Sequence, residues 1–233
     1  MKKTLSIVAV LAIAAMAAYF MLQNPLGRLV KMAIEEFGPE MTQATVSISK
    51  VEISATDGHG TLSGLFLGNP KGYKSDYALK AGIVEIELEP ASLARDVIVI
   101  HKILIDAPQI GYEKVGDMTN FEAIQRNVES YLGAKDGKGE KPAQGGKKMI
   151  IGSFVIRNAK VNYNGMLELS LPDIELRNVG KKTGGATSAQ VVKAVIAELN
   201  TKLALALAKA AVIGGVGGVV VGAGAVLKGL FDK

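Results

Sequence analysis

In Ile83-Val-Glu-Ile-Glu-Leu-Glu89, apolar and acidic residues alternate. Successive side chains of a β-strand point to opposite faces of a sheet, so Val84, Ile86 and Leu88 share one face and the three glutamates share the other. One face therefore meets apolar material, and the other meets water. The three glutamates are best explained as the wet face of the sheet rather than as a cation site.

Shorter stretches with β-character surround this strand. They cover residues 46–48, 51–53, 60–67, 97–105, 109–113, 150–151, 154–156, 161–163, 167–171 and 174–176. The alternation slips by one position at Lys50, which predicts a β-bulge. Because most connections are short turns, we expect a mainly β fold with about eight strands in a curved antiparallel sheet.

The sequence predicts three helices besides the strands. Residues 26–37 keep a helical apolar pattern after Pro25, and Gly38-Pro39 predicts its end. Thr119-x-x-Glu122 is a capping box before an amphipathic helix that reaches Leu132. A second capping box, Thr187-x-x-Gln190, opens a C-terminal amphipathic helix.

The N-terminal segment is apolar enough to cross a membrane. From Thr4 to Leu22 it contains no ionisable group except the Tyr19 phenol, and about 20 helical residues span the hydrocarbon core of a bilayer. The alternative is a cleaved signal peptide, with Lys2-Lys3 as its charged start and Ala15-Met16-Ala17 as its cleavage site. The apolar run continues beyond that site, which favours an uncleaved transmembrane anchor.

A second uncharged segment lies at the C-terminal end, from Ala210 to Leu227. Its glycines Gly214, Gly218 and Gly222 have the four-residue spacing that lets two helices approach closely within a membrane. The segment either associates with the membrane, spanning it or lying in its interface, or folds back against the sheet as a flexible tail.

Composition excludes several classes of function. A chain of 233 residues without cysteine suits one domain and has no disulfides or thiolate metal sites. The net charge of +5 is spread along the chain without a basic, aromatic-rich stripe, so we expect no nucleic-acid partner. His59 and His101 form no convincing catalytic or metal-binding set, and we expect no enzyme activity, no catalytic residues, no metal and no cofactor.

Several stretches together resemble the N-terminal module of AsmA-like proteins of the bacterial envelope. They are Val46-Ser-Ile-Ser-Lys-Val-Glu-Ile-Ser54, Gly60-Thr-Leu-Ser-Gly-Leu-Phe-Leu-Gly-Asn-Pro-Lys-Gly-Tyr73, Ala78-Leu, Glu85-Ile-Glu-Leu-Glu-Pro-Ala-Ser-Leu93, Val97-Ile-Val-Ile-His-Lys-Ile-Leu-Ile-Asp-Ala-Pro108 and Asn120-Phe. The resemblance covers residues 1 to 132 and, more loosely, residues 150 to 180. The turn Asn69-Pro-Lys-Gly-Tyr73 is one of its most specific pieces, and by itself it is best interpreted as a tight turn rather than a ligand loop.

The resemblance implies an inner-membrane protein with a single N-terminal anchor and a β-rich domain in the periplasm. It implies a role in lipid handling or outer-membrane maintenance, with Val84, Ile86 and Leu88 facing lipid in a groove of the sheet. Membrane lipids are the expected partners, together with other envelope proteins or further copies of the chain. Two alternatives remain: an envelope interaction protein with a sealed β core, and a membrane-permeabilising protein that acts through its C-terminal glycines. So short a sheet cannot bridge the envelope alone, which argues against full lipid conduction.

The expected domain organisation follows from these segments. It comprises an anchor at 1–23, a helical stalk at 24–38, a first β-part at 41–132, a flexible linker at 133–148, a second β-part at 149–180 and a C-terminal helix with its glycine-rich segment at 187–233.

Overall fold

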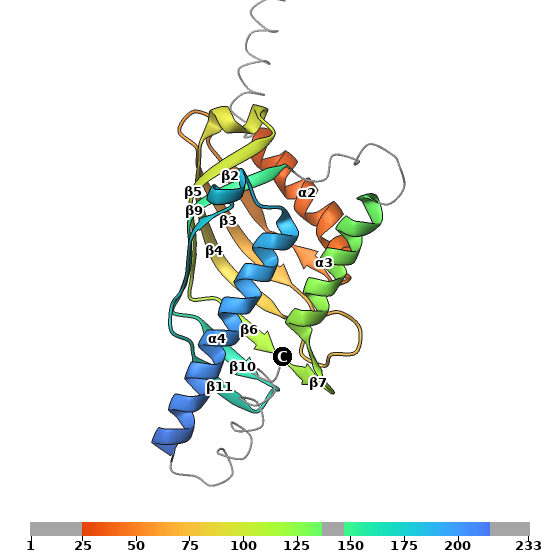
Figure 1. Cartoon of the computed structure of the whole chain (residues 1–233), viewed down its shortest axis with the longest axis vertical. Helices are drawn as coiled ribbons and strands as arrows, with labels where there is room; N and C mark the ends of the chain where they lie inside the picture. The colour runs from red at the N-terminus through yellow and green to blue at the C-terminus, as the bar shows by residue number, and fades with distance from the viewer. Residues whose placement is uncertain (1–24, 137–146, 215–233) are drawn as a thin grey trace, which may run out of the picture.

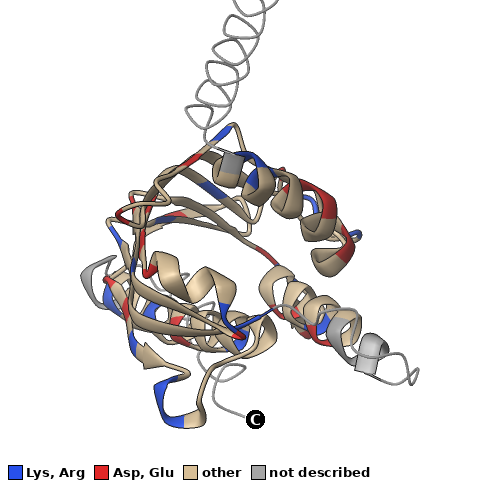
Figure 2. Cartoon of the chain, turned by 90° about the horizontal axis from the view of Figure 1, so that it is seen from above, with Lys and Arg blue, Asp and Glu red and all other residues tan. Residues whose placement is uncertain are grey.

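A computed structural model of the chain describes residues 25–136 and 147–214 (Figure 1). A curled sheet forms a half-barrel, and three helices lie along its concave side: α2 (Pro25–Thr42), α3 (Asn120–Asp136) and α4 (Ser188–Gly214) (Figures 1 and 2). The prediction of a mainly β domain with flanking helices is therefore confirmed.

Ten strands form the large sheet, and two very short strands form a separate hairpin. The ten are β1 (Val46–Ser47), β2 (Lys50–Ile53), β3 (His59–Leu67), β4 (Leu79–Leu88), β5 (Val97–Asp106), β6 (Gln109–Tyr112), β9 (Lys148–Arg157), β10 (Lys160–Tyr163), β11 (Leu167–Ser170) and β12 (Ile174–Val179). The hairpin consists of β7 (Lys114–Val115) and β8 (Met118–Thr119). Short 3₁₀ helices occupy Pro90–Ala94 and Lys181–Thr183.

Several of the ten strands are halves of longer ones. Val84 of β4 pairs with Ile105 of β5, and four residues further along both strands Lys80 pairs with Gln109 of β6. The register is thus unbroken, and β5 and β6 are two parts of one strand that is interrupted at Ala107. The same continuity joins β1 to β2, β9 to β10, and β12 to β11.

The interruptions fall on one line across the sheet. Following the register from strand to strand, the aligned positions are Ser49, Gly64, Gly82, Ala107, Asn158 and Pro172, and we call this line the crease. Three of these residues have a positive φ: Gly64 at 66°, Ala107 at 48° and Asn158 at 56°. Left-handed residues disturb the regular pleat of a strand, and on most strands the alternation of buried residues shifts by one position across the crease.

The shift is visible in the burial of the strands. On β4 the buried residues nearest the crease are Ala81 on one side and Val84 on the other, three positions apart instead of two or four. The slip of alternation at Lys50 in the sequence lies beside the same line. The crease thus accounts for the predicted bulge and for the bend of the sheet.

The prediction of about eight antiparallel strands was wrong in two respects. The sheet contains ten strands, and β5 pairs with β9, and β6 with β10, in the parallel direction. The cause is the long connection between β6 and β9, which leaves the sheet through β7, β8 and α3 and returns on the far side of β5. A long crossover of this kind permits parallel pairing, which a short turn does not.

Helix α2 extends beyond its expected end. The predicted stop at Gly38-Pro39 was wrong, because the helix continues through Pro39 to Thr42. The final turn is held by Thr42 Oγ1, which donates to the Gly38 carbonyl at 2.7 Å, and by Asn127 Nδ2 of α3, which donates to the Thr42 carbonyl at 2.8 Å. Residues 25–38, expected as a stalk, belong to a helix packed against β1 and β2.

The other two helices begin where the capping boxes predict. Thr119 Oγ1 accepts from the Glu122 amide at 3.1 Å, and the Glu122 carboxylate accepts from the Thr119 amide at 2.9 Å. The corresponding contacts between Thr187 and Gln190 measure 3.3 and 2.9 Å. Helix α3 continues to Asp136, beyond the predicted start of the linker at residue 133.

The membrane predictions fall mainly outside the described residues. Across residues 25–136 and 147–214, none of the helices combines the length and the apolar character that a bilayer crossing requires. The expected anchor at residues 1–23 lies outside that part of the chain, as do Gly218 and Gly222, whereas Gly214 is the last residue of α4.

Candidate functional site

The three residues expected to face lipid lie on the concave face of the sheet. Val84 and Leu88 are buried, with 4% and 8% of their surface exposed, and both belong to the hydrophobic core. Ile86, between them, is only half-buried. The sequence therefore placed all three side chains on the apolar face, but only Ile86 retains substantial access from outside.

Ile86 belongs to a group of half-buried isoleucines at the centre of the sheet. It pairs directly with Ile103 of β5, and Leu88 pairs with Ile100 of the same strand. Ile86, Ile100 and Ile103 all pack against the core without being fully covered, and we call them the apolar band. Sequence patterning did not single out Ile100 and Ile103, because every residue from Val97 to Ile100 is apolar and hides the alternation.

Helices α2 and α4 pack on the outer strands on either side of this band, α2 against β1 and β2 and α4 against β11 and β12. In Figure 1, β3 and β4 pass behind the interval between α2 and α4. Both helices turn partly buried apolar side chains towards the core, among them Val30 and Ile34 of α2 and Val192 and Val195 of α4. The band itself consists of aliphatic side chains and suits an apolar ligand better than a polar one.

The convex face carries the charges that the sequence predicts. Lys102 Nζ lies 4.0 Å from Glu85 and 3.8 Å from Glu87, across β4 and β5. These carboxylates are satisfied by a neighbouring strand, which supports the interpretation of an ordinary solvated face. Residues 25–136 and 147–214 contain no cluster of three or more His, Asp or Glu side chains able to hold a metal.

The two histidines lie apart from any cavity described for this part of the chain. His59 is exposed and lies 3.7 Å from Asp57. His101 is exposed on β5.

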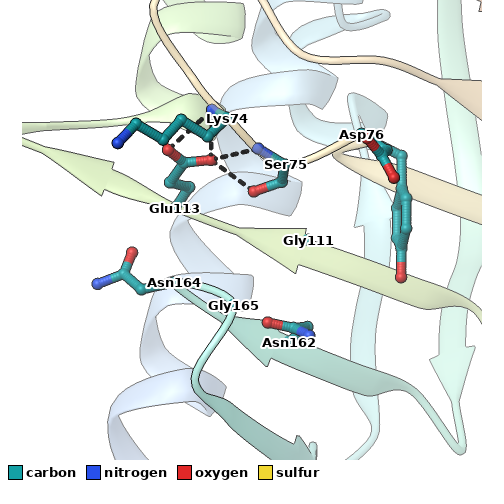
Figure 3. Close-up of a pocket in the computed structure, with 9 residues that line it drawn as sticks. Lys74, Ser75, Asp76, Gly111, Glu113, Asn162, Asn164 and Gly165 are labelled. Atoms are coloured by element: carbon teal, nitrogen blue, oxygen red, sulfur yellow. Dashed lines mark hydrogen bonds between the residues drawn. The ribbon is translucent and has the colours of Figure 1, made fainter.

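A polar hollow of about 330 Å³ lies beyond the crease, near the end of β6 (Figure 3). Lys74, Ser75, Glu113, Asn162 and Asn164 contribute to its walls. Glu113 is only 8% exposed and accepts hydrogen bonds from the Lys74 amide at 2.9 Å, the Ser75 amide at 2.7 Å and the Ser75 hydroxyl at 2.5 Å. Its carboxylate thus holds the loop that contains Lys74 and Ser75.

The hydrogen bonds to Glu113 also affect its pKa. Burial opposes ionisation, but the hydrogen bonds from Ser75 and from the two amides outweigh it and lower the pKa of the carboxyl group. The group is ionised and fully engaged near neutral pH. The ionised carboxylate holds the loop through these hydrogen bonds.

The loop held by Glu113 contains the turn Asn69-Pro-Lys-Gly-Tyr73. Asn69 Nδ2 donates to the Ser75 carbonyl at 2.7 Å, and Gly72 has a φ of 103° within the turn. The interpretation as a tight structural turn is supported by this geometry. Asn120 joins the same network and donates to Asn69 Oδ1 at 2.7 Å.

The aromatic side chain of Tyr112 connects β6 with helices α3 and α4. Tyr112 stacks against Phe121 at 5.8 Å and against Tyr163 at 5.9 Å between ring centres. Its hydroxyl donates to Asn200 Oδ1 of α4 at 2.8 Å, and burial raises its pKa. The sequence offered no signal for this contact, since it joins residues 88 positions apart.

No family model matches the chain, and no curated protein sequence matches it significantly. The resemblance to AsmA-like proteins, which was based on short stretches, therefore stays a prediction.

Proposed function

We propose that this chain is a non-enzymatic protein of the bacterial envelope that handles lipid on the concave face of its sheet. In this proposal residues 4–22 anchor the chain in the inner membrane, the β-domain lies in the periplasm, and acyl chains contact the apolar band. The function contributes to lipid handling or to maintenance of the outer membrane.

The half-buried state of Ile86, Ile100 and Ile103 is the observation that supports this proposal best. Isoleucines at the centre of a sheet covered by helices are normally fully enclosed, as Ile151 is at 0% exposure. The apolar band leaves aliphatic surface within reach at the place where the resemblance predicts lipid contact.

A second candidate is an interaction protein whose core is sealed. Val84 and Leu88 support it, because they are as buried as ordinary core residues. In that case the remaining exposure of Ile86 reflects imperfect packing beneath the helices, and no ligand enters.

Photocrosslinking separates the two candidates. The photoreactive residue p-benzoylphenylalanine is introduced at Ile86 or at Ile103, and the full chain is irradiated in cells with radiolabelled phospholipid. Ile83 is the matched control, because it lies on the same strand with 54% of its surface exposed. Lipid adducts at positions 86 and 103 but not at 83 support lipid handling. Equal or absent labelling at all three contradicts it and favours a sealed core.

Anchoring and orientation need a separate experiment. Fractionation of cells, combined with protease accessibility of tags at both ends of the full chain, tests the membrane location and the side on which the β-domain lies. Recovery of the chain in the soluble fraction would refute the anchor.

A further inference from the structure

Helix α2 carries more exposed large apolar residues than any other element in the described part of the chain. Seven large apolar residues are exposed in the described part of the chain, and three of them lie on α2: Leu29 at 60%, Met32 at 55% and Phe37 at 45%. Ala33 is also exposed. Apolar surface gathered on one helix calls for a partner, whereas single exposed residues do not.

The opposite face of α2 is fixed to the sheet, so the exposed residues cannot turn inward. Lys31 Nζ donates to the Ile48 carbonyl at 2.6 Å and to the Ser49 carbonyl at 2.9 Å. The Ile48 amide donates to Glu35 Oε1 at 3.3 Å. These contacts hold the helix at one rotation. Leu29 precedes Lys31 by two residues, about 200° around the helix axis, so its side chain is directed outward.

Charge changes sign along the exposed side of the helix. Arg28 is exposed in the first half, beside Leu29 and Met32, whereas Glu36 and Glu40 are exposed in the second half (Figure 2). Basic residues next to apolar ones suit the headgroup region of an anionic membrane, and acidic residues suit water. The first half of α2 therefore has the character of an interfacial helix, and the second half does not.

The chain also brings this half of α2 close to the proposed anchor. Only Gln23 and Asn24 separate Leu22 from Pro25, so a fully extended link places Pro25 at most about 11 Å from the end of the apolar segment. Leu29 lies about 6 Å further along the helix axis.

We propose that the first half of α2 lies on the membrane surface, with Leu29 and Met32 inserted in the headgroup region and Arg28 facing anionic lipid. This inference rests on the anchor included in the proposed function. Contact with the bilayer fixes the orientation of the β-domain, and Glu36 and Glu40 remain in water.

Lipid-borne quenching of a fluorescent probe tests this contact. The chain has no native cysteine, so single variants of the full chain can be labelled with NBD at Leu29→Cys, Met32→Cys, Glu40→Cys and Lys193→Cys. All four positions are exposed, so the fold is retained. The proteins are reconstituted in vesicles of phosphatidylethanolamine and phosphatidylglycerol, with or without nitroxide-labelled lipid.

An interfacial helix buries its apolar face about 5–10 Å deep, within reach of the quencher. We expect loss of most NBD fluorescence at positions 29 and 32, and little loss at 40 and 193. Equal quenching at all four positions, in protein that floats with the vesicles, refutes the inference but leaves the anchor intact. A blue-shifted but unquenched probe at 29 and 32 also refutes it, because a second copy or another protein segment then covers α2. Failure to float refutes both the anchor and the inference.

Discussion

Asn69 and Asn120 are 51 positions apart in the chain, yet their side chains share a hydrogen bond of 2.7 Å. Asn120 is completely buried, and it also donates to the Gly111 carbonyl at 2.7 Å and accepts from the Glu113 amide at 3.1 Å. One side chain thus joins the turn after β3, the strand β6 and the start of α3. Both asparagines belong to stretches on which the resemblance to AsmA-like proteins rests.

Substitution Asn120→Ala should destabilise the protein strongly. It leaves the Gly111 carbonyl and the Glu113 amide without this partner inside the core, and such losses reduce the free energy of unfolding by about 2 to 4 kcal/mol. Urea titration of the purified full chain in mild detergent measures the loss. The exposed Asn162→Ala is the control and should change stability by less than about 0.5 kcal/mol. Equal stability of the two variants would contradict the proposed role of Asn120.

Glu113 should make stability depend on pH in the acidic range. Because folding lowers its pKa, its contribution is full above the ordinary glutamate value of about 4.3 and is lost as the pH falls through the lower value of the folded protein. Glu113→Gln should therefore be less stable than the wild type at pH 7 by about 1.5 to 3 kcal/mol. The difference should shrink at pH 3.

The comparison requires unfolding curves of both proteins at each pH. Glu168→Gln is the control, because its exposed ion pair with Lys160 should contribute less than about 1 kcal/mol. A difference for Glu113→Gln that stays constant from pH 7 to pH 3 would show that the loss is steric rather than electrostatic.

The hydrogen bond between Tyr112 and Asn200 should stabilise the attachment of α4. Tyr112→Phe retains the stacked rings and loses only the hydroxyl, so we expect a loss of about 1 kcal/mol. A double-mutant cycle with Asn200→Ala isolates the interaction, and Tyr77→Phe serves as a control at a tyrosine that retains more exposure. Additive effects of the two substitutions would mean that the contact contributes nothing.

Substitution Gly64→Ala should disturb the crease. Its φ of 66° disfavours a side chain, and a Cβ atom there would clash with Ser49 Oγ. We expect the free energy of unfolding to fall by about 1 to 3 kcal/mol from backbone strain alone. The steric clash should add to this loss. At Gly82, the neighbouring crease position on β4, an added Cβ atom would have no other atom within 4 Å, so Gly82→Ala should be tolerated. Thermal unfolding of the two variants provides the comparison, and equal losses would contradict this account.

Local patterns in the sequence predicted most of the elements. The alternation in residues 83–89 places Val84, Ile86 and Leu88 on one face of β4, and the two capping boxes mark the starts of α3 and α4. These features depend on residues that are only a few positions apart, so they can be predicted from the local sequence. The end of α2 could not be found in this way, because Thr42 is held by Asn127 of α3, 85 positions away.

The arrangement of the strands was decided by tertiary contacts. The slip at Lys50 was visible in the sequence, but its alignment with Gly64, Ala107 and Asn158 requires the register of the whole sheet. The parallel pairing of β5 with β9 likewise depends on the path of a long connection.

Tertiary contacts also decided which residues of the candidate site are exposed. The sequence by itself determined which side chains face the core, since alternation along a strand is a local property. Only the tertiary structure decided that Val84 and Leu88 are enclosed while Ile86 is not, because the degree of burial depends on how helices α2 and α4 pack across the concave face.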